Sequence, residues 1–304
     1  MKCAIMRLFL AATVAAFLFS ARANVEAQSA QSAHHKPKAP NSVRLYVFDC
    51  GVLHNADMGR FNLKKEDVTT SDMSMACFLI AHPKGNLIWD TGAIPDDSWK
   101  PTGAMITQHV TLPDGSTRDA DVDKNLRDQL KEIGYSPDDI DYLALSHYHY
   151  DHTGNANEFA SATWLVPQAE HDVMFGGAKV YGSLWSATFS ALKDSKTIIL
   201  KDNEYDVFGD GKVIIKSAPG HTQGHQVLYV KLAKTGGVVL SGDLYHYPAE
   251  KTLDRTPTFD FSPDQTRASR REVDAFLKKT NSQLWIQHDF AGNAKLKKSP
   301  QFYE

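Results

Sequence analysis

Short apolar runs alternate with polar turns along most of the chain, from about residue 42 onward. Apolar runs bounded by Gly, Pro, Asn or Asp are typical of strands. By this criterion we expect strands within residues 44–53, 74–82, 86–92, 141–146, 162–170, 212–219, 225–232, 236–243 and 283–289. The second and third of these runs flank the turn Pro83-Lys84-Gly85, which predicts a hairpin.

Two other segments have the period of an amphipathic helix. Residues 122–134 place leucines on one face and end at Gly134, and residues 262–280 begin with the N-cap residue Ser262. Strand runs, a helix and a strand, followed by the same order again, predict two similar layers with helices outside. The expected fold class is therefore α/β, an αββα sandwich in a single domain.

Residues 171–196 are harder to interpret, because they combine glycines with Met174, Phe175, Trp185 and Phe189. We expect helical or looped cover here. Two interpretations stay open: the segment packs on the core, or it forms a lid over a site.

The N-terminus differs from the rest of the chain. Two basic residues precede an apolar run at residues 8–21, and an A-x-A pattern follows at Ala21-Arg22-Ala23. We interpret residues 1–23 as a secretory signal peptide, with a second cleavage pattern ending at residue 27; a retained membrane anchor is the alternative. Residues 24–41 are expected to form a disordered leader and residues 42–304 the domain, in the periplasm or outside the cell.

Composition excludes some classes of partner. The 304 residues are 42% hydrophobic and carry a net charge of −3, which gives no basis for binding nucleic acid or an acidic membrane surface. Cys50 and Cys77 remain after signal cleavage. They form either one disulfide or two buried thiols, and the sequence does not distinguish these alternatives.

The candidate chemistry is concentrated where apolar runs end. The segment SHYHYDHTGN follows the run at 141–146 and holds His147, His149, Asp151 and His152. His147 and His149 are two residues apart, so an extended chain points both the same way. Further candidates, each at the end of a strand-like run, are His221, Asp243 and His288. Imidazole nitrogens and carboxylate oxygens are ligands of zinc and related metals, so we predict a metal site.

These motifs resemble the signature of the metallo-β-lactamase-fold hydrolases. His147-Tyr148-His149-Tyr150-Asp151-His152 matches H-x-H-x-D-H, Asp90-Thr91-Gly92 matches an early D-T-G turn, and residues 220–225 match G-H-T-x-G-H. Gly242-Asp243 and His288 match later motifs, so the resemblance covers nearly the whole chain from about residue 44. It implies the αββα sandwich.

The resemblance also assigns roles. It implies a first metal bound by His147, His149 and His221, a second bound by Asp151, His152 and His288, and a bridging Asp243. Zinc is the expected metal, with manganese, iron or cobalt as alternatives. Asp90 either orients a ligand imidazole or only shapes its own turn, and His225 is expected to make structural hydrogen bonds.

Within the superfamily the chain looks most like the N-acyl-homoserine lactonase branch, because zinc β-lactamases generally lack the bridging carboxylate. The resemblance implies opening of the lactone ring by a metal-bridging hydroxide, with Asp151 moving the proton. The alternatives are another hydrolase on the same site (β-lactamase-like, arylesterase or phosphoesterase) and a non-catalytic metal-binding protein. The expected partner is a small acyl lactone, without nucleic acid or stable membrane insertion, and a homodimer is left open.

One position departs from that branch. Its lactonases usually carry a tyrosine three residues after the bridging aspartate, where this chain has His246 between Tyr245 and Tyr247. We expect His246, or a neighbouring tyrosine such as Tyr245, to assist the developing oxyanion. The alternative is that His246 is only a surface residue near the site. Candidates for contacting the acyl chain are Trp99, Met105, Phe175 and Trp185.

Overall fold

The computed structural model describes residues 36–55, 57–176 and 186–304. The predicted signal peptide and most of the predicted leader lie outside these residues, as does Trp185. Residues 37–304 form one compact unit. No helix among the described residues is both long enough and apolar enough to cross a membrane.

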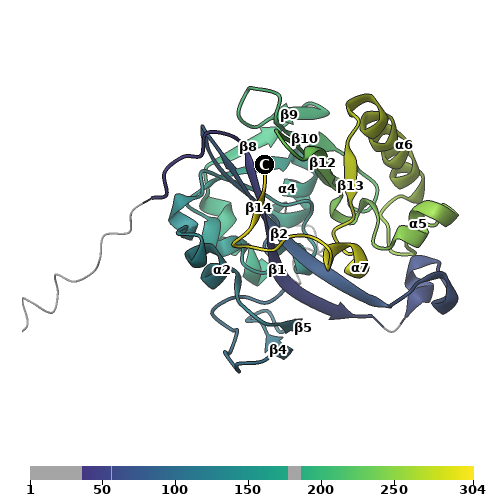
Figure 1. Cartoon of the computed structure of the whole chain (residues 1–304). Coiled ribbons are helices and arrows are strands. Elements are labelled where there is room, and N and C mark those ends of the chain that lie inside the picture. Colours follow the sequence, from purple (N-terminus) through teal and green to yellow (C-terminus); the bar gives the residue numbers. More distant parts are fainter. Residues whose placement is uncertain (1–35, 56, 177–185) are drawn as a thin grey trace, which may run out of the picture. The chain divides into compact units, whose positions relative to one another are not determined.

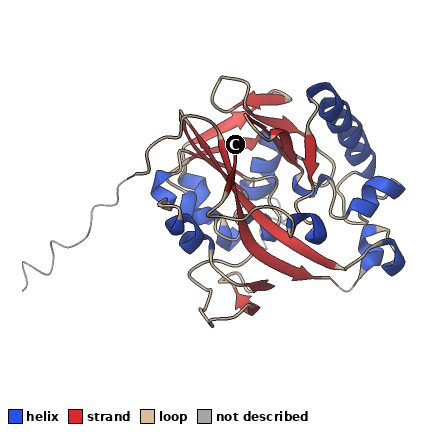
Figure 2. Ribbon diagram, viewed as in Figure 1, coloured by secondary structure: helices blue, strands red, loops and turns tan. Residues whose placement is uncertain are grey.

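The unit contains two sheets (Figure 2). The described part of the chain gives a nine-stranded sheet in the order β4-β5-β1-β2-β3-β6-β7-β8, with β14 paired to β1. Its strands are β1 (Arg44–His54), β2 (Asp72–His82), β3 (Gly85–Trp89), β4 (Ile106–Thr111), β5 (Thr117–Val122), β6 (Tyr142–Ala144), β7 (Thr163–Pro167), β8 (Thr197–Leu200) and β14 (Phe302–Tyr303). Strands β3, β6, β7 and β8 run parallel to their neighbours in that series.

The second sheet has five strands in the order β13-β12-β11-β10-β9 over the same described residues. These are β9 (Glu204–Asp206), β10 (Val213–Ser217), β11 (Gln226–Leu232), β12 (Gly236–Leu240) and β13 (Gln283–Trp285). The helices are α2 (Leu126–Glu132), α3 (Tyr150–Thr153), α4 (Gln168–Phe175), α5 (Pro248–Leu253), α6 (Pro263–Thr280) and α7 (Phe290–Asn293) (Figure 1).

Alternation along the strands divides the core into layers. In β2, Cys77 and Leu79 face one hydrophobic cluster while Phe78 and Ile80 face another. The second cluster also includes Leu228 of β11 in the other sheet. This cluster therefore fills the space between the two sheets. Because successive side chains of a strand point to opposite faces, a strand buried on both faces reads as a continuous apolar run.

Helices cover the outer faces of both sheets. Leu126 and Leu130 of α2 join the cluster on the outer face of the large sheet. Val273 of α6 joins a third cluster with Val227 and Val239, on the outer face of the small sheet. The architecture is the predicted αββα sandwich. The N-cap prediction for α6 is confirmed, because the Ser262 side chain accepts from the Gln265 N–H.

Two open questions from the sequence are answered here. The structure joins Cys50 and Cys77 in a disulfide that links β1 to β2, with Cα atoms 6.0 Å apart. In the segment 171–196, Phe175 packs edge-on against Trp164 and Phe189, with ring centroids within 5.8 Å. These described residues therefore belong to the core, which favours the packing interpretation over the lid.

Candidate metal centre

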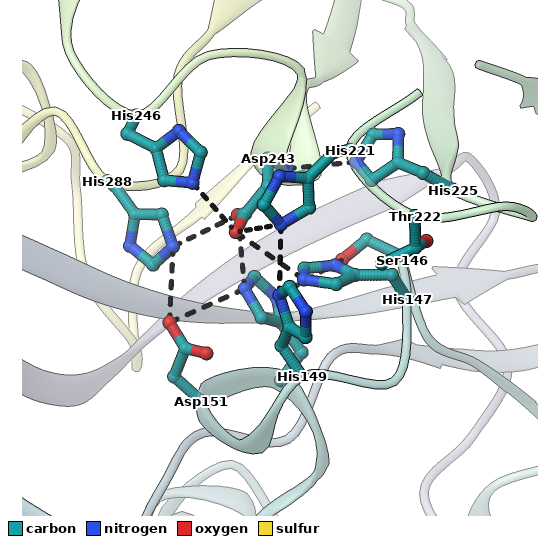
Figure 3. A network of polar contacts seen from close by, with 12 residues as sticks. Ser146, His147, His149, Asp151, His221, Thr222, His225, Asp243, His246 and His288 are labelled. Atoms are coloured by element: carbon teal, nitrogen blue, oxygen red, sulfur yellow. Dashed lines mark hydrogen bonds and ion pairs between the residues drawn. The ribbon is translucent and has the colours of Figure 1, made fainter. Parts of the chain in front are cut away.

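All seven predicted ligands lie close together, and Figure 3 labels each of them except His152. His147 and His149 follow β6, and Asp151 and His152 lie in the one-turn helix α3. The remaining three come from the ends of other strands: His221 after β10, Asp243 after β12 and His288 after β13. Loops at strand ends converge because the sheets hold their starting points rigidly.

The ligand atoms form two groups among the described residues. One group is His147, His149, His221 and Asp243, and the other is Asp151, His152, Asp243 and His288. Within each group the atoms lie within 4.8 Å of one another. Asp243 is the member that the two groups share, and it is the residue for which the resemblance implies a bridging role.

Asp243 presents a different oxygen to each group. Its Oδ2 lies 3.4 Å from His147 Nε2 and 3.2 Å from His221 Nε2. Its Oδ1 lies 3.1 Å from His152 Nε2 and 3.0 Å from His288 Nε2. One carboxylate with its two oxygens turned to two sets of nitrogens is the arrangement that a bridging ligand requires.

The residues present fit a pair of divalent cations. Although they lie close together, buried polar atoms at the centre make no hydrogen bond: Nε2 of His147, His152 and His288, and Oδ1 of Asp243. Buried polar atoms in proteins are nearly always partnered, so a cluster of such atoms calls for an ion. The donors are imidazole nitrogens and carboxylate oxygens, which suit zinc and related metals.

Hydrogen bonds on the far side of each imidazole set its orientation. Asp90 Oδ2 lies 2.9 Å from His152 Nδ1, and Asp260 Oδ1 lies 2.9 Å from His221 Nδ1. His288 Nδ1 donates to the Ser74 carbonyl at 2.8 Å. Such bonds hold the other ring nitrogen toward a metal. Asp90 therefore does contact a ligand imidazole, in addition to shaping a turn at a left-handed φ of 55°.

Two supporting acids were not identified from the sequence. Asp260 comes from the loop before α6, and Glu170 lies on α4. Neither belongs to a metal motif, and no local pattern distinguishes them from other acidic residues. His225 has the structural role expected of it: Nδ1 donates to the Ala218 carbonyl at 2.9 Å, and Nε2 accepts from the Asp243 N–H at 2.9 Å. Burial lowers the pKa of His225 to about 3, so it is neutral.

The buried imidazoles around Asp243 control the pKa of its carboxyl group. Burial raises the pKa of Asp243, but the positive fields of His152 and His288 outweigh it and hold the pKa well below the usual value. Burial drives the pKa of His147 and His149 well below the ordinary value. The neutral imidazole is the form that binds a metal.

His246 lies at the site, whereas Tyr245 does not. The Nε2 of His246 lies 3.1 Å from Asp243 Oδ2, and its Nδ1 lies 3.3 Å from Glu250 Oε1. Burial alone would lower the pKa of His246. The nearby carboxylates of Asp243 and Glu250 have the larger combined effect, and they raise this pKa to about 10. Tyr245 is instead buried beneath Arg270, whose guanidinium carbon lies 4.1 Å from the ring centroid. The suggestion that Tyr245 assists an oxyanion is therefore corrected.

A cavity of about 800 Å³ opens onto the two ligand groups. Its apolar lining consists of Leu53, Phe61, Met73, Phe259 and Phe261. The cavity has the size and character of a small-molecule site. The prediction of acyl-chain contacts was wrong for three residues: Trp99 and Phe175 pack against the core, and Met105 is exposed and does not line this cavity. The fourth, Trp185, lies outside the described residues.

Comparison with known proteins agrees with this arrangement. Residues 73–280 match the Metallo-beta-lactamase superfamily. The N-acyl homoserine lactonase AttM of Rhizobium radiobacter is 30% identical over 275 residues, which cover 86% of this chain and 98% of AttM. The N-acyl homoserine lactonase AiiA of Bacillus thuringiensis subsp. kurstaki is 26% identical and is matched over 85% of its length, by 74% of this chain.

Solved structures share the fold. A mutant of B. thuringiensis AiiA with N-decanoyl-L-homoserine bound at its active site superposes with a TM-score of 0.67 and 22% identity, covering 86% of this chain and 99% of that one. AidC, a dizinc quorum-quenching lactonase, gives a TM-score of 0.61 and 19% identity, covering 89% and 96%.

Proposed function

We propose that this chain, which belongs to the metallo-beta-lactamase superfamily, is a dinuclear metal-dependent hydrolase that opens the lactone ring of N-acyl-homoserine lactones. The observation that carries the proposal is the shared carboxylate of Asp243, with one oxygen toward each ligand group. The relatives that match the chain over most of their length and bear lactonase names support the substrate class.

In this proposal His147, His149 and His221 would hold one cation, Asp151, His152 and His288 the other, and Asp243 both. When bound, a pair of divalent cations polarises an ester carbonyl and lowers the pKa of a water molecule to about 7. Zinc is the proposed metal, and manganese, iron and cobalt accept the same donors.

The protein's own groups would then handle protons and orientation. Water adds to the lactone carbonyl carbon, the ring C–O bond breaks, and the products are a carboxylate and an alcohol. Asp151 lies at the cavity wall, with Oδ2 3.4 Å from His288 Nε2. We assign it the transfer of a proton from the attacking water to the departing ring oxygen.

His246 is assigned to the carbonyl end of the substrate. It lines the cavity and stands where the lactonase branch usually has a tyrosine. An imidazole N–H supplies the same kind of donor to a developing oxyanion as a phenol does. Phe61 and Phe259 pack edge-on against the His246 ring, with centroids 5.0 and 5.7 Å away, so the apolar wall for the acyl chain adjoins this group directly.

The test is a substrate panel on the metal-loaded protein that begins at about residue 24. Acyl-homoserine lactones of several chain lengths, a nitrocefin-type β-lactam, an aryl ester and a phosphodiester are compared, with ring opening followed as the gain of one water by mass. We expect turnover of the lactones to dominate and to disappear in His149→Ala. Turnover of another substrate class without the lactones contradicts the lactonase assignment and leaves the hydrolase. Metal binding without any hydrolysis contradicts both.

Export of the mature chain is part of the proposal. The signal-peptide pattern at residues 1–23 and the disulfide between Cys50 and Cys77 both suit an oxidising compartment. Sequencing the N-terminus of protein recovered from the periplasm or medium should give a start between residues 24 and 28. Recovery of the uncleaved chain from the cytoplasm contradicts export.

A further inference from the structure

Glu170 is a buried carboxylate that the proposed chemistry does not use. It lies near the start of α4, directly after β7, and is 2% exposed. A buried carboxylate is costly unless its oxygens accept hydrogen bonds, so its partners indicate what it is for.

One oxygen of Glu170 reaches the first ligand loop. The N–H of Tyr148 donates to Glu170 Oε1 at 2.7 Å. Tyr148 lies between His147 and His149 in the chain, so this hydrogen bond fixes the His147–Tyr148 peptide group, within the segment that carries both histidines.

The same carboxylate reaches the loop that carries His221. The Gly224 N–H donates to Glu170 Oε2 at 2.9 Å, and the Thr222 hydroxyl lies 3.0 Å from Oε2 and 3.1 Å from Oε1. This approach requires a glycine, because a Cβ at Gly224 would lie 2.7 Å from the Glu170 backbone nitrogen.

We propose that Glu170 is a positioning residue that holds the histidines of the first ligand group, His147, His149 and His221, in register with one another. The inference rests on the proposed dinuclear site. It explains how two loops that are far apart in sequence bring His149 Nδ1 to within 2.9 Å of His221 Nε2.

The second ligand group has different supports. His152 forms a hydrogen bond with Asp90, and His288 donates a hydrogen bond to the Ser74 carbonyl. None of the hydrogen bonds described above runs from Glu170 to these residues. Loss of the Glu170 carboxylate should therefore weaken one metal site and leave the other intact.

The test separates the two sites by mutation and uses Zn²⁺ affinity as its readout. His288→Ala leaves the first group intact, and His221→Ala leaves the second. Glu170→Gln is then added to each, since the amide keeps the shape but turns one acceptor into a donor facing N–H groups. Zn²⁺ affinity is measured by competition with a chelator. We expect a loss of about 10–100-fold in the His288→Ala background and less than about twofold in the His221→Ala background.

Gln129→Ala is the matched control for folding. Gln129 is also buried and also ties two segments, accepting from the Asp49 N–H at 3.0 Å and donating to the Asp49 carbonyl at 2.7 Å. This variant should leave both Zn²⁺ affinities unchanged. Equal losses from Glu170→Gln in both backgrounds, or no loss in either, overturn the inference while the dinuclear site stands. A wild-type protein that binds no Zn²⁺ overturns the dinuclear site and the inference together.

Discussion

At the scale of single residues, the motifs identified the candidate ligands, but among the groups that orient them they offered only Asp90. His147, His149 and Asp151 stand in one short segment, so their residue types and spacing are enough to predict a metal site. Asp260 reaches His221 from 39 residues away in sequence, and only tertiary packing brings them together. Local patterns carry no information about such partners, which is why the supporting acids were missed.

His246 gives a prediction at this scale. Replacing it with alanine removes the donor proposed to face the oxyanion, so kcat/KM for the lactone should fall by about 10²–10³. His246→Tyr, which restores the residue usual in the lactonase branch, should recover much of that loss. The measurement is steady-state kinetics together with metal analysis, and two metals per chain should remain in both variants. An alanine variant with wild-type kcat/KM contradicts the role.

At the scale of elements, helix α6 organises the segment that carries Asp243 and His246. Arg270 of α6 is buried and donates to the Leu244 carbonyl at 2.9 Å and to Glu250 Oε2 at 2.9 Å. Its guanidinium also covers the ring of Tyr245. This packing explains why Tyr245 faces the helix side of the small sheet and cannot serve the cavity.

Removing that anchor should destabilise the protein. Arg270→Ala removes the arginine partner of the buried Glu250, and we expect a loss of about 3–5 kcal/mol in the free energy of unfolding. Arg271→Ala on the same helix is the control, because Arg271 is exposed and surface substitutions usually change stability by about 0.5 kcal/mol or less. Chemical denaturation of the metal-free proteins measures both. Equal stability of the two variants contradicts the anchoring role.

Strands of the core and the amphipathic helices α2 and α6 were predictable from sequence, and peripheral strands were not. Strands such as β2 and β11 are buried on both faces and read as apolar runs. The hairpin of β4 and β5 was not predicted, because its strands expose alternate residues and are rich in Thr and Asp. A strand that buries only one face gives a weaker signal than one between two layers.

At the scale of the whole molecule, the layered order followed from the alternation of strands and helices, and the placement of the site followed from strand ends. What the sequence could not supply was the cavity, because its walls come from distant segments. Phe61 lies between β1 and β2, and Phe259 lies between α5 and α6. The rings of these two residues meet edge-on at 5.4 Å only in the folded chain.

The stability of the whole molecule should also depend on pH through Asp96. Burial raises the pKa of Asp96 from 3.8 to about 7, against the opposing N–H groups of Arg127 and Leu126. Because the folded pKa lies above the unfolded one, the stabilising contribution is full below about pH 3.8 and is lost as pH rises through about 7. At about 1.36 kcal/mol per pH unit, the total change is about 4 kcal/mol.

Asp96→Asn removes this titration and is the comparison to make. Between pH 4 and 7.5 the free energy of unfolding of the metal-free wild type should fall relative to that of the variant, by up to about 4 kcal/mol. Denaturation curves across this range measure the difference. Parallel pH profiles for the two proteins show that the Asp96 pKa is not raised.

The central claim is that two cations share the carboxylate of Asp243. Anomalous scattering from crystals of the metal-loaded protein, recorded at the absorption edge of the bound metal, tests it most directly. The account predicts two peaks about 3.5–4 Å apart, one beside His147, His149 and His221 and the other beside Asp151, His152 and His288, with Asp243 between them. A single peak, or peaks away from Asp243, would contradict it.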